Sequence, residues 1–193
     1  MIIRLDFGGA AKRAHTIRIG PRPAPGVQIE TELSPDLPFK DSSVDEIFLD
    51  HTLAHADNFL GIMEELWRIS RPSTIIHVRL PHGSSSWAIS RDPRHDRSYT
   101  LETFNYFDPR FNRSGCESHA RFRVEHARLY LTGARRDDRG LALARGMFSG
   151  IIDGLVNRNR GMQYRAERWF APLVGGFEEF YVVLSTIKET SIG

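Results

Sequence analysis

The 193-residue sequence predicts one α/β domain built around a mostly parallel sheet. Seven short runs have the alternating or continuously apolar pattern typical of strands. Through the first hundred residues these runs alternate with loops and one strongly patterned helix, which favours parallel strands with covered faces. The last two runs are joined by a long helical connection. Together the observations predict a seven-stranded sheet with helices packed against it.

Five of the predicted strands lie in the first half of the chain. They span residues 1–7, 15–19, 27–33, 44–49 and 74–80. Glycine and proline separate them: Gly8-Gly9 follows the first strand, Gly20-Pro21 follows the second, and Pro81 stops the fifth. Because proline and glycine interrupt regular structure, these positions mark where each strand ends.

The clearest helix is predicted over residues 57–69, where Asp57 or Asn58 can cap the first turn. Its apolar side chains recur at helical spacing and are Phe59, Leu60, Met63, Leu66 and Trp67. Arg71-Pro72 ends it. We also predict a short helix over residues 100–106 and a glycine-interrupted helix over residues 141–156. The last two strands are predicted at 122–131 and 177–187.

Composition excludes several classes of protein. No run of 18 apolar residues could span a bilayer and no leader-like segment precedes the first strand, so we expect a cytoplasmic protein with no membrane partner. The single cysteine, Cys116, rules out an internal disulfide and a cysteine-based metal site. Residues 91–193 carry 17 basic and 13 acidic side chains, but no basic stripe is interleaved with aromatic residues. We therefore expect no nucleic-acid partner.

Candidate acid–base residues cluster after the fourth and fifth predicted strands. They are His51, His55, His82, His95 and Asp96. Since ligands bind at the carboxyl ends of parallel strands, these side chains are expected to face a substrate. A metal site formed by His51, His82 and His95 with Asp50 or Asp96 is the alternative. Their spacing is not that of a compact ligand set, so we expect no metal.

Three segments carry a resemblance to a known family. They are LPFKDSSVDEIFLDHTLAH (37–55), EELWRISRPSTIIHVRLPH (64–82) and LPHGSSSWAISRDPRHDRSYTLETFNYFDP (80–109). In this order they resemble the class I S-adenosylmethionine (SAM) dependent methyltransferases, in particular a small bacterial subgroup of the type 11 kind. The resemblance covers residues 2–110 and extends loosely to 157–169. It implies a Rossmann-like sheet with helices on both faces and an antiparallel last strand.

The resemblance implies a SAM site along the strand ends. Its glycine turn would be Asp6-Phe7-Gly8-Gly9, and the fourth strand would contribute Asp50 and His51. Glu32-Leu33 occupies the place of the family's acidic residue beside the adenine.

The chain departs from the family at the second strand, which ends in Ile19-Gly20 where the family has a ribose-binding carboxylate. Losing one charged hydrogen bond costs about 1.5–3 kcal/mol, or roughly ten- to a hundredfold in affinity. Glu30 or Glu32 on the third strand are the candidates to compensate.

The function expected from these features is SAM-dependent methyl transfer to a small-molecule or saccharide-like acceptor. His82, His95 and His55 are the candidate catalytic residues, and residues 82–121 and 132–170 of the single domain would cover the acceptor. Aromatic residues could wall this pocket or pack a cap over the sheet edge; they are Trp87, Tyr99, Phe104, Tyr106 and Phe107.

Two alternatives remain, together with an open question on assembly. The first is a non-catalytic methyltransferase-like binding or assembly domain. The second is a dinucleotide or nucleotide-sugar enzyme, which is weaker because no Gly-x-Gly-x-x-Gly follows the first strand. Whether the chain forms a homodimer is left open.

Overall fold

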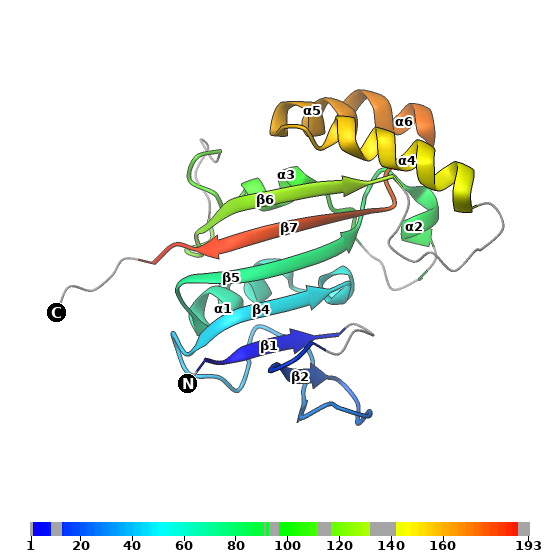
Figure 1. Ribbon diagram of the computed structural model, residues 1–193. Helices are drawn as coiled ribbons and strands as arrows, with labels where there is room; N and C mark the ends of the chain where they lie inside the picture. The colour runs from blue at the N-terminus through cyan, green and yellow to red at the C-terminus, as the bar shows by residue number, and fades with distance from the viewer. Residues whose placement is uncertain are drawn as a thin grey trace.

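The computed structural model describes residues 2–8, 13–90, 92, 97–111, 117–131 and 142–188, with only the backbone described at 87, 88, 142–148 and 174. A seven-stranded sheet forms its centre, in the order β3-β2-β1-β4-β5-β7-β6 (Figure 1). The strands are β1 (Arg4–Phe7), β2 (Ile17–Gly20), β3 (Ile29–Glu30), β4 (Val44–Asp50), β5 (Ser70–Pro81), β6 (Phe122–Tyr130) and β7 (Glu179–Thr186).

The first five strands pair in parallel, and β7 runs antiparallel between β5 and β6. The predicted Rossmann-like sheet with an antiparallel last strand is therefore confirmed. The predicted third strand shortens to two residues, because β3 is an edge strand that pairs with β2 only at Ile29 and Glu30. The fifth strand is longer than predicted and starts at Ser70, directly after the helix.

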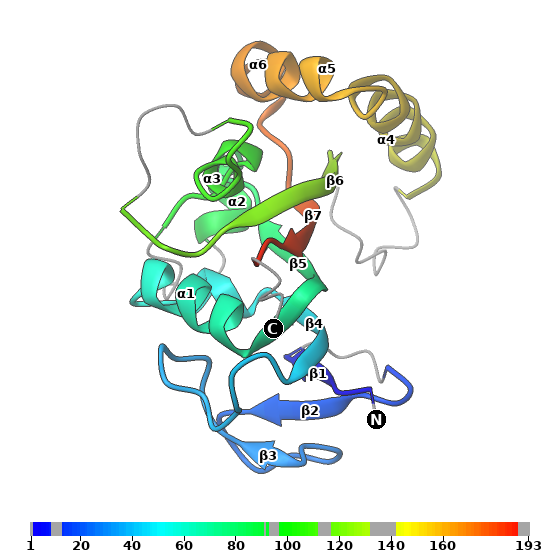
Figure 2. The same ribbon diagram turned by 90° about the vertical axis from the view of Figure 1, so that its left-hand side faces the viewer.

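The helical elements are η1 (Thr52–His55), α1 (Phe59–Ile69), α2 (Ser86–Ser90), α3 (Leu101–Asn105), α4 (Ala142–Val156), α5 (Arg160–Arg165), the π-helix η2 (Ala166–Phe170) and α6 (Ala171–Val174). Figure 2 shows α1, α2 and α3 on one side of the sheet. Helix α4 lies on the opposite side next to β6, and α5 and α6 continue across the top. Helices thus lie on both faces, as predicted, and the helices described on the second face lie near β6.

Helix α1 forms where its apolar pattern predicts. The Asn58 side chain accepts a hydrogen bond from Gly61 N at 3.0 Å and caps the first turn. The buried apolar side chains of the helix are Phe59, Ile62, Met63, Leu66 and Ile69. Leu60, which the sequence places in the apolar stripe, is 40% exposed. Trp67 packs on the edge of the core and donates Nε1–H to Ile187 O at 2.9 Å.

The two faces of the central strands differ sharply. Side chains on the face toward α1 and α3 are buried, as in Leu49 of β4 and Val78 of β5. Their neighbours Phe48 and His77 point to the opposite face and are only half-buried. Among the described residues no helix occurs between β1 and β4, so no described helix from that connection covers this second face. We refer to it as the open face.

Candidate active site

The end of β1 is the centre of the edge predicted to bind the cofactor. Gly8 follows β1 with φ of +83°, a conformation that favours glycine. A Cβ at this position would lie 2.6 Å from Thr52 Oγ1 and 3.2 Å from the carbonyl oxygen of Asp50. Thr52 in turn donates a hydrogen bond to the carbonyl oxygen of Phe7 at 2.5 Å. Glycine is therefore required here so that the ends of β1 and β4 can approach each other.

Asp6, one turn residue of the predicted SAM site, is fully buried on the open face. Its Oδ1 accepts a hydrogen bond from Arg13 Nη1 at 2.9 Å, and the Arg13 guanidinium lies 4.6 Å from the ring centre of Phe48. Asp6 Oδ2 has no hydrogen-bond partner among the described residues. Burial raises the pKa of this carboxyl, although the positive charges of Arg13 and Arg18 oppose the rise. Gly9, its predicted companion, lies outside the described residues.

A basic hollow of about 330 Å³ lies beside β2, lined by Arg13, Thr16, Arg18, Gly26 and Gln28. It is shaped by the β2–β3 loop, which folds back so that Gln28 Oε1 accepts from Arg18 N at 2.8 Å. Two guanidinium groups at one hollow suit an anionic group. Neither arginine is among the site residues predicted from the sequence.

The acidic residues on β3 lie close to the end of β2. Glu30 pairs in register with Gly20, the residue at which the family's ribose carboxylate is missing. Neighbouring strands are about 5 Å apart, so a glutamate on β3 can reach over the end of β2. Glu30 and Glu32 are both exposed, and Leu33 is half-buried. No hydrogen bond or ion pair engages Glu30 or Glu32 side chains within the described part of the chain.

A charged cluster stands where β4 and β5 end and β7 begins. His51 Nε2 lies 3.3 Å from Glu179 Oε1 and 3.7 Å from Asp50 Oδ1. Arg79 Nη1 lies 3.3 Å from Glu179 Oε2, and Arg79 Nε lies 3.9 Å from Asp50 Oδ1. His51 itself has a left-handed backbone with φ of +61°, which turns the chain sharply out of β4. A histidine held between two carboxylates at a strand end is well placed to exchange a proton.

Sequence reasoning missed Arg79 and Glu179 as partners of His51. Glu178-Glu179 reads as a solvated approach to the last strand, because the sequence does not tell which strand β7 pairs with. The antiparallel pairing sets Glu179 opposite Pro81 of β5, and so beside the end of β4. The local signal for this role of Glu179 was the pair Glu178-Glu179 at the start of an apolar strand.

The predicted catalytic histidines are scattered. His82 is buried, with Nε2 2.7 Å from Glu167 Oε1 and Nδ1 2.8 Å from Ser84 Oγ. Ser84 N also donates to His82 Nδ1 at 3.1 Å, so the other ring nitrogen is the one that donates to Glu167. His55 is exposed, 4.0 Å from Asp92 Oδ2. His95 and Asp96 lie outside the described residues.

His82 therefore connects the loop after β5 to the π-helix η2. Glu167 Oε1 accepts a further hydrogen bond from Leu101 N at 2.9 Å, which joins α3 to the same network. Within the described residues, no three His, Cys, Asp or Glu side chains gather as metal ligands would. His51 and His82 thus belong to separate networks.

The aromatic residues after β5 mostly pack. Tyr99, Phe104 and Phe107 are buried, and each has its ring centre within 6.1 Å of the Phe59 ring. The Tyr99 hydroxyl donates to Leu53 O at 2.9 Å, and burial raises its pKa. These three rings belong to the core between α1 and α3. The Trp87 side chain lies outside the described residues.

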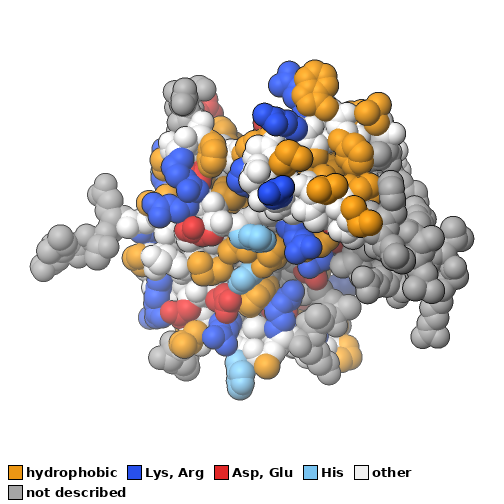
Figure 3. All heavy atoms as spheres, turned by 45° about the horizontal axis from the view of Figure 1, so that its top comes forward, with side chains coloured by type: hydrophobic (Ala, Val, Ile, Leu, Met, Phe, Trp, Pro, Cys, Tyr) orange, Lys and Arg blue, Asp and Glu red, His pale blue; other side chains and the backbone are white. Residues whose placement is uncertain are grey.

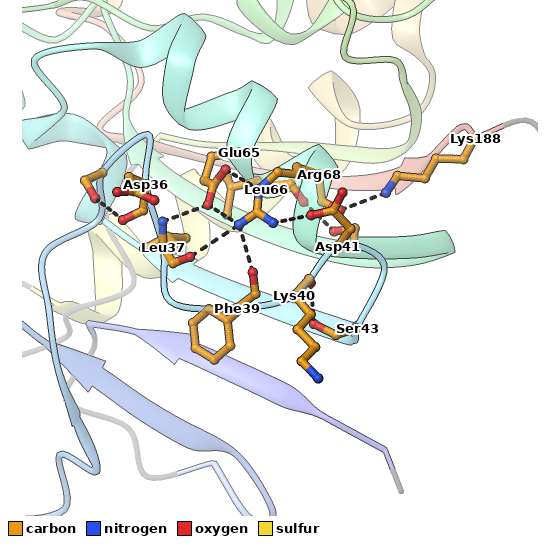
Figure 4. Close-up of polar contacts among 12 residues, drawn as sticks. Asp36, Leu37, Phe39, Lys40, Asp41, Ser43, Glu65, Leu66, Arg68 and Lys188 are labelled. Carbon is orange, nitrogen blue, oxygen red and sulfur yellow. Dashed lines mark hydrogen bonds and ion pairs between the residues drawn. The ribbon is translucent and has the colours of Figure 1, made fainter.

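The Leu-Pro-Phe segment is held by helix α1 (Figure 4). Glu65 Oε1 accepts from Leu37 N at 2.7 Å, and Arg68 Nη2 donates to Phe39 O at 2.8 Å. Arg68 also pairs with Glu65 and Asp41, and these carboxylates raise the already high pKa of the guanidinium. The network holds the segment that precedes β4. It therefore also helps to set the position of Asp50 and His51 at the other end of that strand.

Comparison with known families finds one match, in the first part of the chain. Residues 3–78 match a family model described as a methyltransferase domain. Among curated proteins, no sequence matches this chain.

Solved structures match the fold over nearly the whole chain. A SAM-dependent methyltransferase from Archaeoglobus fulgidus is 12% identical, with 95% of this chain and 86% of that one covered and a TM-score of 0.55. The YcgJ protein from Bacillus subtilis is 13% identical, with 98% and 93% covered and a TM-score of 0.51. The [4+2]-cyclase SpnF is 12% identical, with 96% and 74% covered and a TM-score of 0.54. At such identities the likeness shows the fold alone.

Proposed function

We propose that this chain, which has the class I methyltransferase fold and matches the methyltransferase domain model over residues 3–78, transfers a methyl group from SAM to a small-molecule or saccharide-like acceptor. The observation that carries the proposal is the edge formed by the ends of β1, β2, β3 and β4. There Gly8 follows β1, and Glu30, whose carboxylate no described residue engages, lies on β3, with β2 between the two strands.

The residues at this edge fit the polar groups of SAM. Asp6 Oδ2 is a buried acceptor without a partner among the described residues, and the ammonium of the methionine part would satisfy it. Glu30 would accept hydrogen bonds from the ribose hydroxyls across the end of β2. Glu32 and Leu33 follow on the adenine side, as the family resemblance implies. Gly9, Asp50 and His51 would complete the contact surface.

SAM supplies a methyl group already activated on a sulfonium, so alignment of the acceptor provides most of the acceleration. His51, between Glu179 and Asp50, would accept the proton of a hydroxyl or amine acceptor. His82 would act as a positioning residue, because both of its ring nitrogens bond within the protein. The assignment of His55 and His95 to the acceptor side stays a prediction, as does the cap formed by residues 82–121 and 132–170.

Calorimetric titration with SAM and S-adenosylhomocysteine tests the proposal. We expect binding of both, and a loss of roughly ten- to a hundredfold in affinity for Glu30→Gln, because one charged hydrogen-bond acceptor is removed. Glu32→Gln identifies which of the two carboxylates holds the ribose. Glu117→Gln, an exposed residue far along the chain, is the matched control. Absence of binding by either ligand at millimolar concentration would overturn the proposal.

The second candidate is a non-catalytic methyltransferase-like binding domain. It is favoured by one observation: β2 ends in Ile19-Gly20 without a carboxylate of its own. Incubation with SAM and an extract of native small molecules separates the two functions. Release of S-adenosylhomocysteine that depends on the extract would exclude the non-catalytic candidate. Binding without such release would favour it.

A further inference from the structure

The outer surface of α4, α5, η2 and α6 exposes many large apolar side chains. Five of the eight exposed large hydrophobic residues in the described part of the chain lie within these elements. They are Ile151 (63%), Leu155 (57%), Met162 (37%), Trp169 (69%) and Leu173 (82%). Single exposed apolar side chains are common, but a concentration of this kind marks an interaction surface.

Arginines stand among these residues along the chain. Ile151 and Leu155 are one turn apart on α4, Arg158 lies in the turn before α5, and Met162, Arg165, Trp169 and Leu173 follow at intervals of three or four residues from α5 to α6; all are exposed. Arg168 is also exposed, and its guanidinium lies 5.5 Å from the Trp169 ring centre. We call this surface the apolar–arginine stripe. Figure 3 shows hydrophobic and basic side chains gathered over these helices.

The acidic residues of these helices point inward. Between residues 149 and 175 the only acids are Asp153 and Glu167. Asp153 Oδ1 accepts from Leu131 N at 2.9 Å, and Glu167 is engaged by His82 and Leu101. The stripe therefore presents three arginines, Arg158, Arg165 and Arg168, with no carboxylate among them.

This charge pattern discriminates between occupants. A symmetric contact with a second copy would place the stripe against itself, bringing arginines together without an acid to pair them. Exposed Ile, Leu and Trp side chains beside arginines are instead the composition of helices that lie in the interface of a membrane. No described helix is long and apolar enough to cross a bilayer, so the contact would be peripheral.

We propose that the apolar–arginine stripe binds the surface of membranes that contain anionic lipids. The side chains of Ile151, Leu155, Trp169 and Leu173 would enter the interfacial region, while the three arginines meet lipid phosphates. This departs from the expectation of no membrane partner, which rested on the lack of a spanning run and of a leader-like segment. The proposal does not depend on SAM binding.

Flotation with vesicles tests it. We expect the protein to float with vesicles of equal parts phosphatidylglycerol and phosphatidylcholine, and to bind vesicles of phosphatidylcholine alone much more weakly. Leu173→Gln should lower the partition coefficient by about tenfold, because a leucine side chain no longer enters the interface. Arg165→Gln and Arg168→Gln should each lower it by about fivefold on anionic vesicles only. Leu60→Gln, exposed on α1 outside the stripe, is the matched control and should bind as the wild type.

Quenching of tryptophan emission in the wild-type protein reports directly on contact with lipid. Brominated lipids in the anionic vesicles should quench tryptophan emission, and Trp169→Phe, which keeps the apolar surface, should lose most of that quenching. No flotation with anionic vesicles would overturn the proposal, as would equal binding by Leu173→Gln and the wild type. A dimer in analytical ultracentrifugation that Leu173→Gln dissociates, without vesicle binding, would assign the stripe to a second copy and also overturn it.

Discussion

The two faces of the sheet are built from alternate residues of the same strands, yet different interactions stabilise their side chains. On the covered face, Leu49, Val78 and Val182 are fully buried under α1 and α3. On the open face, Phe48 stacks on His77 with ring centres 4.5 Å apart. His77 Nε2 lies 3.0 Å from Glu46 Oε1, and His77 Nδ1 lies 2.6 Å from the Tyr181 hydroxyl.

The comparison shows how this chain supports a sheet with few helices. One face receives the hydrophobic stabilisation that comes with removal of apolar surface from water. On the other face, half-buried side chains such as His77 and Phe48 are held by ion pairs, hydrogen bonds and ring stacking. Since such contacts remain near water, each contributes less than a buried side chain.

The largest expected effect is on the covered face. Leu49→Ala should lower the free energy of unfolding by about 2–5 kcal/mol, because it leaves a cavity under α1. Phe48→Ala, the adjacent residue on the open face, should lower it by less, since the Phe48 side chain is half-buried. Urea denaturation of both variants measures the difference. Equal losses would show that the open face is as well packed as the other.

A smaller effect is expected at Asp108, a buried carboxylate that holds β6 on the covered side. Its Oδ2 accepts from Val124 N at 2.9 Å, and it pairs with Arg110. Asp108→Asn should cost about 1.5–3 kcal/mol at neutral pH, because hydrogen bonds to a charged acceptor are lost. Thermal unfolding with Glu117→Gln as control checks it. A variant as stable as the wild type would remove Asp108 from the elements that hold β6.

The same carboxylate predicts a dependence on pH. Burial by itself raises the pKa of Asp108, but the hydrogen bonds from Arg110 and from backbone N–H groups outweigh it, and the folded-state pKa is lowered from 3.8. The carboxylate therefore contributes its full stabilisation above the unfolded pKa, and that contribution is lost as the pH falls through the lower folded value. Stability measured below pH about 4 should fall more steeply for the wild type than for Asp108→Asn. Parallel curves would contradict this.

The smallest effect is expected on the open face. Tyr181→Phe removes the hydroxyl that bonds to His77 Nδ1 and should cost about 0.5–1.5 kcal/mol. Desolvation by burial raises the pKa of the Tyr181 hydroxyl, so the neutral form is the one present at ordinary pH. Chemical denaturation gives the cost. A loss as large as that of Leu49→Ala would mean that the two faces are equally important for stability.

The sequence predicted the arrangement of the sheet better than that of the site. Local patterns located all seven strands and α1, because alternation and helical spacing are properties of neighbouring residues. They did not predict α5, η2 and α6, whose packing depends on contacts such as Gln163 Nε2 to Ala127 O at 2.6 Å. Asn159 and Gly161 at the start of α5 and Pro172 in α6 weaken the local signal for a helix.

The site residues divide in the same way. Asp6, Gly8, Asp50 and His51 lie at strand ends as the sequence indicates, since a strand end is a local feature. Their partners come from far along the chain: Glu179 reaches His51 only because β7 returns antiparallel beside β5. His82 is not part of the group around His51. Its side chain is buried, and Glu167 of the later helix η2 accepts a hydrogen bond from it.

The sequence by itself determined the seven strands of a mostly parallel sheet, the glycine at the end of β1 and the missing carboxylate at the end of β2. Only the tertiary structure decided which residues lie side by side, such as Glu30 in register with Gly20 and Arg79 paired with Glu179. It alone revealed the open face and the apolar–arginine stripe. The reason is physical: periodicity records which side chains share one element, whereas burial depends on what other elements cover it.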